Sequence, residues 1–277
     1  MGLSVRHQIS IALIPIYSLF LLIGIFLAIR HGFGRNAGWL YLILLSLIRL
    51  IGASLDLATI NDPTNIDLFI GGATLQSIGL SALILLLLGL VGRVLASAAQ
   101  TRPQAASIIT PRRLRLVQTI VIVGLALGIA AGVKAGTNVA QNGPGSFNSK
   151  TSLAKASVAL MIVGFVAVVG VTALVAVYSR GGVIPAGDGR LLLAIALSLP
   201  FVLVRLVYSC VSTFGNDKRF GGLTGDVYVR LGMSIIMEIV VVLICEAAGL
   251  TLEKAPKHHD HGSAGAVARG KEAREDA

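Results

Sequence analysis

Seven stretches of the sequence are apolar over about 20 residues, and they constrain the fold more than any other feature. A helix rises 1.5 Å per residue, so about 20 apolar residues cross a hydrocarbon core of ~30 Å. The stretches lie at 9–29, 38–60, 67–92, 114–133, 153–178, 191–213 and 227–251. The sequence therefore predicts an all-α fold, a bundle of seven transmembrane helices in a multi-pass integral membrane protein.

The polar segments divide the chain into one domain and a tail. Segments between the apolar stretches are rich in Gly, Pro, Asn, Asp and Arg, which is typical of loops. We expect a single transmembrane domain over residues 1–252. Residues 253–277 are polar and charged, which predicts a disordered cytoplasmic tail. A His-His-Asp-His run at 258–261 carries metal-ligand types. A flexible tail gives it no fixed geometry, so we expect neither a metal nor a cofactor.

The composition argues against two broad classes of protein. Only 13% of the residues are charged, against ~25% in a typical soluble domain. A soluble enzyme is therefore not expected. The net charge of +10 would fit a nucleic-acid-binding protein, but such a protein gathers its Lys and Arg on one solvated face. The apolar stretches leave little such face, so we expect no nucleic-acid partner.

The basic residues instead predict how the bundle is oriented. Lys and Arg are enriched in the cytoplasmic loops of membrane proteins. If the N-terminus lies outside, the inner segments hold more than twice as many Lys and Arg as the outer segments. The sequence therefore favours an outer N-terminus and an inner C-terminus, with membrane lipids as partners. Plasma and internal membranes both fit this pattern.

Ionisable residues inside the apolar stretches mark the candidate site, because charge within a membrane is costly and is usually functional. Asp56 follows Arg49 by seven residues, about two turns, so the two share a helix face. Glu238 shares a stripe with Ser234 and Arg230, four and eight residues earlier. The candidate ligand-binding residues are Arg49, Asp56, Gln76, Arg205, Tyr208 and Glu238.

Two interpretations of these charges remain open. In the first, they form buried ion pairs, such as Arg49–Glu238 and Asp56–Arg205, that fix the register of the helices. In the second, they line a polar pocket that opens outward or to the lipid and holds a small amphipathic molecule. The four charges sum to zero, so the first interpretation needs no ligand.

Four segments of the sequence resemble a known family. They are 30–39 (RHGFGRNAGW), 46–53 (SLIRLIGA), 200–209 (PFVLVRLVYS) and 237–242 (MEIVVV). Together they resemble an uncharacterised family of fungal seven-helix integral membrane proteins, over most of the chain up to about residue 250. The resemblance implies the seven-helix fold and a fungal source, and it implies no particular activity.

The function that these features favour is not enzymatic. We expect a membrane protein that binds, senses or moves a small lipophilic molecule or lipid. Its arginines would bind an anionic group of that ligand. One alternative is an intramembrane enzyme resembling the seven-helix terpene cyclases, with Asp56 or Glu238 as the acid. Its carbocations would need aromatic faces, and only 5% of the residues are aromatic. Another alternative is a receptor-like protein that couples to a cytoplasmic partner.

Overall fold

The computed structural model describes residues 5–31, 37–62, 65–101, 111–142, 151–179, 186–215 and 226–252, and these residues are helical apart from short turns. The helices are α1 (Val5–His31), α2 (Ala37–Ala58), α3 (Ile66–Thr101), α5 (Pro111–Asn142), α6 (Ser152–Ser179), α7 (Ala186–Phe214), α8 (Val227–Arg230), η3 (Leu231–Ile236) and α9 (Met237–Thr251). The last three follow one another without a gap and form one continuous helix, in which η3 is π-helical. In the described ranges, seven helices are thus long and apolar enough to cross a membrane.

The helices extend beyond several of the apolar stretches. The helix predicted from the stretch at 67–92 continues to Thr101, and the one predicted from 114–133 continues to Asn142. Backbone hydrogen bonding does not require apolar side chains, so a helix can continue past the point where its sequence becomes polar. The expected tail at 253–277 lies outside the described residues.

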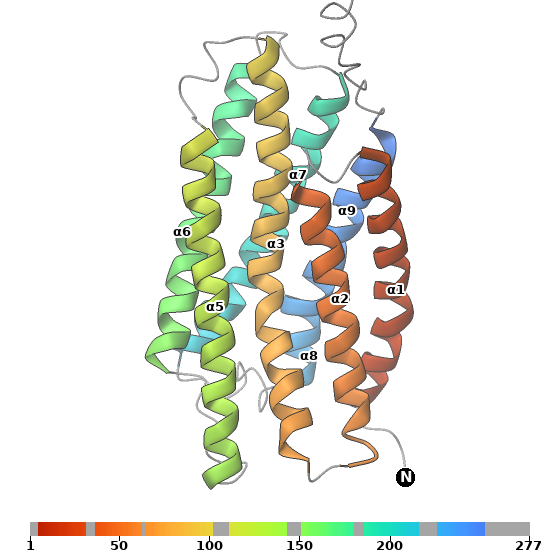
Figure 1. The fold of residues 1–277 in the computed structure, drawn as a ribbon, viewed down its shortest axis with the longest axis vertical. Helices are drawn as coiled ribbons and strands as arrows, with labels where there is room; N and C mark the ends of the chain where they lie inside the picture. The colour runs from red at the N-terminus through yellow and green to blue at the C-terminus, as the bar shows by residue number, and fades with distance from the viewer. Residues whose placement is uncertain are drawn as a thin grey trace, which may run out of the picture.

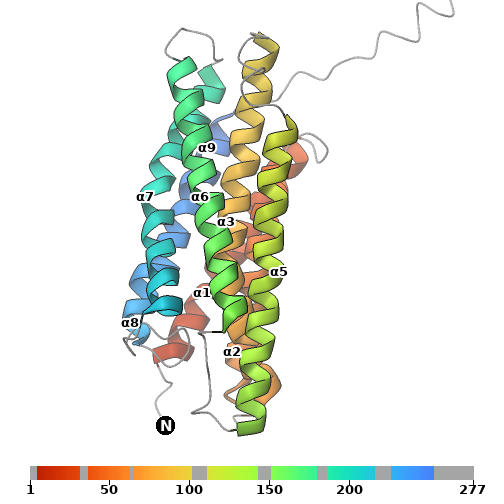
Figure 2. The same cartoon turned by 90° about the vertical axis from the view of Figure 1, so that its left-hand side faces the viewer.

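The helices run side by side along the long axis of an elongated bundle, each antiparallel to the one before it (Figure 1). The start of α1, the end of α2 and the start of α8 therefore lie at the same end of the bundle. We call this the α1-start end. After a quarter turn, α7, α8 and α9 stand on one side and α5 on the other (Figure 2).

Helix α3 occupies the middle of the bundle. Residues 78–91 of this helix are all buried, including the leucine-rich run at 83–88. It packs against α2, α5, α6, α7 and α9. A helix that is apolar on every side is stable only where every side is covered. The sequence of α3 therefore makes it the core around which the other helices are arranged.

The outer helices present large apolar side chains on their free faces. Leu22 of α1 is 66% exposed, and Leu116 of α5 and Val177 of α6 are exposed to a similar degree. Soluble monomers rarely expose contiguous apolar surface on this scale. The exposed apolar faces agree with the length and composition of the helices, and together they indicate a multi-pass membrane protein.

Glycines let α5 approach both of its neighbours closely. A Cβ atom on Gly132 would lie 2.8 Å from Oγ1 and 3.2 Å from Cα of Thr74 on α3. On the other side, a Cβ on Gly124 would lie 3.0 Å from Cβ of Leu160 on α6. The Ser157 hydroxyl of α6 also donates a hydrogen bond of 2.7 Å to the Gly124 carbonyl. Small residues at such contacts are the usual means of packing membrane helices.

Candidate functional site

One carboxylate in the middle of the bundle is shared by two arginines. Nε of Arg49 on α2 donates to Oε1 of Glu238 on α9 at 2.5 Å, and its Nη2 donates to Oε2 of the same carboxylate. Nη2 of Arg205 on α7 lies 3.1 Å from that Oε2. All three side chains are buried, and Glu238 has no exposed surface at all. The predicted Arg49–Glu238 pair is therefore present, and it includes a second guanidinium.

Two further groups add hydrogen bonds to this cluster, and Nε of Arg205 is buried without a partner. The Tyr17 hydroxyl of α1 donates to Oε1 of Glu238 at 2.8 Å. Nη1 of Arg205 donates to the Ser234 carbonyl at 2.9 Å and also to the Ser234 hydroxyl. Ser234 lies in the π-helical segment η3, and such widened turns are frequent at functional sites. Tyr17, Arg49, Arg205, Ser234 and Glu238 are called the central cluster below.

A glycine on α3 makes room for the central cluster. A Cβ on Gly79 would lie 2.6 Å from Nη2 of Arg205 and 2.8 Å from Oε2 of Glu238, and it would also clash with Nη2 of Arg49. Only a residue without a side chain lets the guanidinium groups pack against the backbone of α3 at this point. Gly79 is absent from the set of residues predicted from charge alone. Its signal in the sequence is a glycine between Ile78 and Leu80, at the start of the long apolar run of this helix.

Asp56 has a different partner from the one predicted. Its Oδ1 accepts a hydrogen bond of 2.6 Å from Nε of Arg6, and its Oδ2 accepts one of 2.7 Å from the Ser10 hydroxyl. The predicted Asp56–Arg205 pair is wrong. Asp56 lies two turns beyond Arg49 along α2, or about 10 Å, close to the first turn of α1. Arg205 is already held by Glu238 and Ser234.

Arg6 is absent from the candidate residues predicted from the sequence, because it lies in an outer segment and not in the interior of an apolar stretch. The spacing of Arg6 and Ser10, one helical turn apart at the start of the first apolar stretch, is the signal that could have identified it. Residues four apart lie on the same helix face, so both reach the carboxylate of Asp56.

A cleft leads from the α1-start end of the bundle to the central cluster. Its polar lining is Arg6, Ser10, Arg49, Asp56 and Arg230, and its apolar lining is Leu13, Ile48, Ala53 and Leu75, with Gly52 and Gly72 between them. These residues come from α1, α2, α3 and the last position of α8. The cleft holds about 20 Å³ of free space, which is room for roughly one water molecule. Arg49 belongs to both the cleft and the central cluster, so the two are continuous.

The structure therefore separates the candidate residues into two groups. Arg49 and Asp56 line the cleft, whereas Arg205 and Glu238 lie in the filled central cluster. Tyr208 is buried one turn beyond Arg205 on α7 and is not among the lining residues of the cleft. Gln76 lies on α3, and its side chain is outside the described part of the structure.

The side chains of the site determine which ligands it could hold. In the ranges that the structure describes, no three His, Cys, Asp or Glu side chains come together as a metal site would require. The His-Asp run at 258–261 lies outside those ranges. Cys210 and Cys245 are both free thiols. What the cleft offers is guanidinium groups, one carboxylate, a hydroxyl and an apolar wall.

The shared carboxylate predicts a ranking of two isosteric substitutions. We expect Glu238→Gln to destabilise the protein by about 3–5 kcal/mol, because it leaves two buried guanidinium groups without a counter-charge. Asp56→Asn should cost less, about 1–3 kcal/mol, because the Arg6 side chain is 23% exposed and can be hydrated. Thermal unfolding in detergent measures the loss of stability in each variant. Equal costs for the two substitutions would contradict the central role of Glu238.

The close approach at Gly79 predicts a second effect. We expect Gly79→Ala to destabilise the protein by about 1–3 kcal/mol, because the added methyl group overpacks the site and pushes the ion pairs apart. Gly72→Ala is the matched control on the same helix, since a Cβ there meets no atom within 4 Å. The same unfolding measurement compares them. If both variants unfold at the same temperature, the packing of α3 against the cluster is not as tight as described.

Comparison with known proteins identifies the family of the chain. A family model described as "Domain of unknown function (DUF7702)" matches residues 3–255. No curated protein and no solved structure matches the sequence. The match includes every helix described above and both groups of candidate residues. The chain therefore belongs to the DUF7702 family.

Proposed function

We propose that this chain is an integral membrane protein that binds, senses or moves a small lipophilic molecule or lipid through the cleft at the α1-start end. The observation that carries the proposal is the mixed lining of the cleft. The lining combines the charged groups of Arg6, Asp56 and Arg230 with apolar side chains that include Leu13 and Leu75. Ligand sites of this kind combine an apolar surface with a few polar groups that fix orientation.

The position of the cleft supports an amphipathic ligand. Arg6 lies in the first turn of α1, and Arg230 ends the single turn of α8, so both are at one end of the bundle (Figure 1). In a membrane this end lies near the lipid headgroups, where polar and apolar groups meet. The surrounding membrane lipids then contact the outer faces of the helices, and they are also a source of ligands.

The enzymatic alternative has less support from the geometry. A cyclase of the terpene type needs an acidic proton that faces an apolar cavity with aromatic walls. No aromatic residue is among the lining residues of the cleft. Asp56 accepts hydrogen bonds from Arg6 and Ser10, and Glu238 accepts them from Arg49 and Tyr17. The receptor-like alternative is supported by topology alone.

The proposal is tested by filling the cleft without changing any charge. We expect Gly72→Val to abolish binding of a co-purifying small molecule, because the new side chain enters open space in the cleft. Native mass spectrometry of the purified protein measures the bound mass. Ligand at about 100 times its Kd adds roughly 2.7 kcal/mol of stability, so a thermal shift with added lipid extract is a second readout.

Gly170→Val is the control for this experiment, since Gly170 lies on α6 away from the cleft and a Cβ there also meets no atom within 4 Å. It should keep both the bound mass and the thermal shift. The proposal fails if the Gly72→Val protein folds and retains the ligand as well as the control does.

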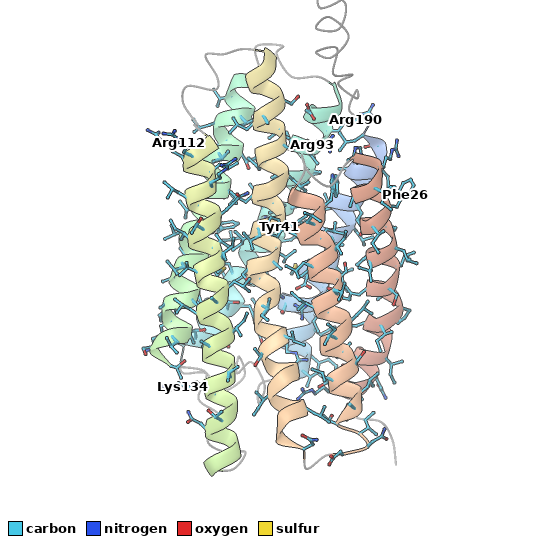
Figure 3. The ribbon with its side chains drawn as sticks, viewed as in Figure 1. Phe26, Tyr41, Arg93, Arg112, Lys134 and Arg190 are labelled. Carbon is cyan, nitrogen blue, oxygen red and sulfur yellow. The ribbon has the colours of Figure 1, made fainter. Side chains whose placement is uncertain are left out.

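The proposed orientation places the N-terminus and the cleft outside and the C-terminus inside. Arg93, Arg112 and Arg190 gather toward the end of the bundle opposite the cleft, while Lys134 lies in the other half (Figure 3). An inner face rich in arginine follows the usual charge asymmetry of membrane proteins. The family resemblance of the sequence motifs also implies a fungal source.

Labelling of introduced cysteines tests this orientation. Ser152, at the start of α6, and Arg112, in the first turn of α5, are both exposed at opposite ends of the bundle. In sealed vesicles with the extracellular face outward, an impermeant maleimide should label Ser152→Cys and not Arg112→Cys. Cys210→Ser provides a background without the partly exposed native thiol. The reverse pattern of labelling would invert the topology.

A further inference from the structure

The charges around the cleft do not balance. The cleft and the central cluster together contain four arginines, Arg6, Arg49, Arg205 and Arg230. They contain two carboxylates among the described residues, Asp56 and Glu238. Counted over the described residues, the connected polar interior therefore carries a surplus of two positive charges. Charge of one sign is unfavourable in a medium of low dielectric constant unless anions balance it.

Half of this surplus lies on Arg230, and the other half lies in the central cluster, where the single carboxylate of Glu238 faces two arginines. Arg6 is paired with Asp56, and Arg49 and Arg205 share Glu238. Arg230 makes no salt bridge to any residue in the described ranges, and its Nε is buried without a hydrogen-bond partner. It lies at the mouth of the cleft, close enough to Arg6 and Asp56 to interact with their charges.

We propose that the mouth of the cleft binds the phosphate monoester headgroup of an acidic lipid, with Arg230 as its principal contact and Arg6 as its second. This inference rests on the proposed function and specifies the ligand class. Guanidinium groups match phosphate oxygens with paired hydrogen bonds. A phosphate monoester carries about −1.5 to −2 charges near pH 7, which is enough to balance the net charge of +1 that Arg6, Asp56 and Arg230 carry together at the mouth.

The volume inside the cleft determines where the headgroup binds. About 20 Å³ inside the cleft is too small for a phosphate group, since it holds roughly one water molecule. The headgroup therefore binds at the mouth, where the Arg6 and Arg230 side chains are partly exposed. The acyl chains then extend into the adjacent leaflet past Leu13, and a water molecule occupies the space leading to Arg49.

The experiment measures lipid binding to the purified full-length protein by native mass spectrometry and by thermal shift. The probes are dioleoyl phosphatidic acid, dioleoyl phosphatidylcholine, glycerol 3-phosphate and inorganic phosphate. We expect the wild-type protein to bind phosphatidic acid at least tenfold more tightly than phosphatidylcholine. Arg230→Gln should weaken phosphatidic acid binding about tenfold, or about 1.4 kcal/mol, and Arg230→Lys should weaken it less.

Two controls separate this effect from misfolding and from general electrostatics. Arg115→Gln removes an exposed arginine of α5 near the opposite end and should leave binding unchanged. Arg230→Gln without lipid should unfold at the wild-type temperature or above, because it removes an unpaired charge. A lower unfolding temperature for that variant would overturn the inference, since Arg230 would then be a structural residue.

The remaining outcomes distinguish a lipid phosphate from a water-soluble one. They also distinguish failure of the phosphate site from failure of the proposed function. Competition by glycerol 3-phosphate as strong as that by phosphatidic acid would support the phosphate site and identify a water-soluble ester as its ligand. Equal binding of phosphatidic acid and phosphatidylcholine, insensitive to Arg230→Gln but lost in Gly72→Val, would overturn the inference and leave the proposed function standing. Binding of no probe and no co-purifying molecule would overturn both.

Discussion

The shared carboxylate of Glu238 is the interaction on which the arrangement of the bundle depends. It accepts hydrogen bonds from Arg49 of α2 and Tyr17 of α1 and holds Arg205 of α7 at 3.1 Å. A single residue of α9 thereby links three other helices at one depth. Buried ion pairs contribute little net stability compared with apolar packing, but removing one partner is costly. Such a cluster selects one register of the helices, because any slip by one residue would leave a buried charge without its partner.

Helix α3 supplies the complementary constraint. Its leucine-rich middle is covered on every side, so it packs tightly without directing which neighbour lies where. Gly79 provides the exception, since the arginines of two other helices fit against its backbone. The apolar core therefore determines that the helices gather around α3, and the charges around Gly79 determine their register. In the widened turn at η3, the Ser234 carbonyl lies 2.9 Å from Nη1 of Arg205, which gives a further partner to the guanidinium that shares its carboxylate.

Much of this fold could be predicted from the sequence, because a membrane span depends on length and apolarity that a single chain displays directly. The Arg49–Glu238 pair was also predictable, since each residue lies in the interior of an apolar stretch, where a partner is needed. The partner of Asp56 was not. A sequence gives the depth of a residue along its own helix, but it does not show which helices are neighbours, and the choice between Arg6 and Arg205 depends on that. Gly79 escaped prediction for a related reason, because a residue without a side chain shows its role only through the groups that approach it.

The two interpretations of the intramembrane charges apply to different parts of the molecule. At Glu238 both carboxylate oxygens accept hydrogen bonds and the three charged side chains are buried, which is what a register-fixing cluster requires. At the mouth of the cleft, Arg230 makes no salt bridge within the described ranges, its Nε lacks a hydrogen-bond partner, and open space adjoins it. A neutral side chain of similar size at position 230 would avoid the cost of burying a charge. Stabilisation of the fold alone therefore does not explain an arginine at this position. The mouth of the cleft is therefore the place that we propose for an external anion, and Arg49 connects that position to the cluster that links four helices.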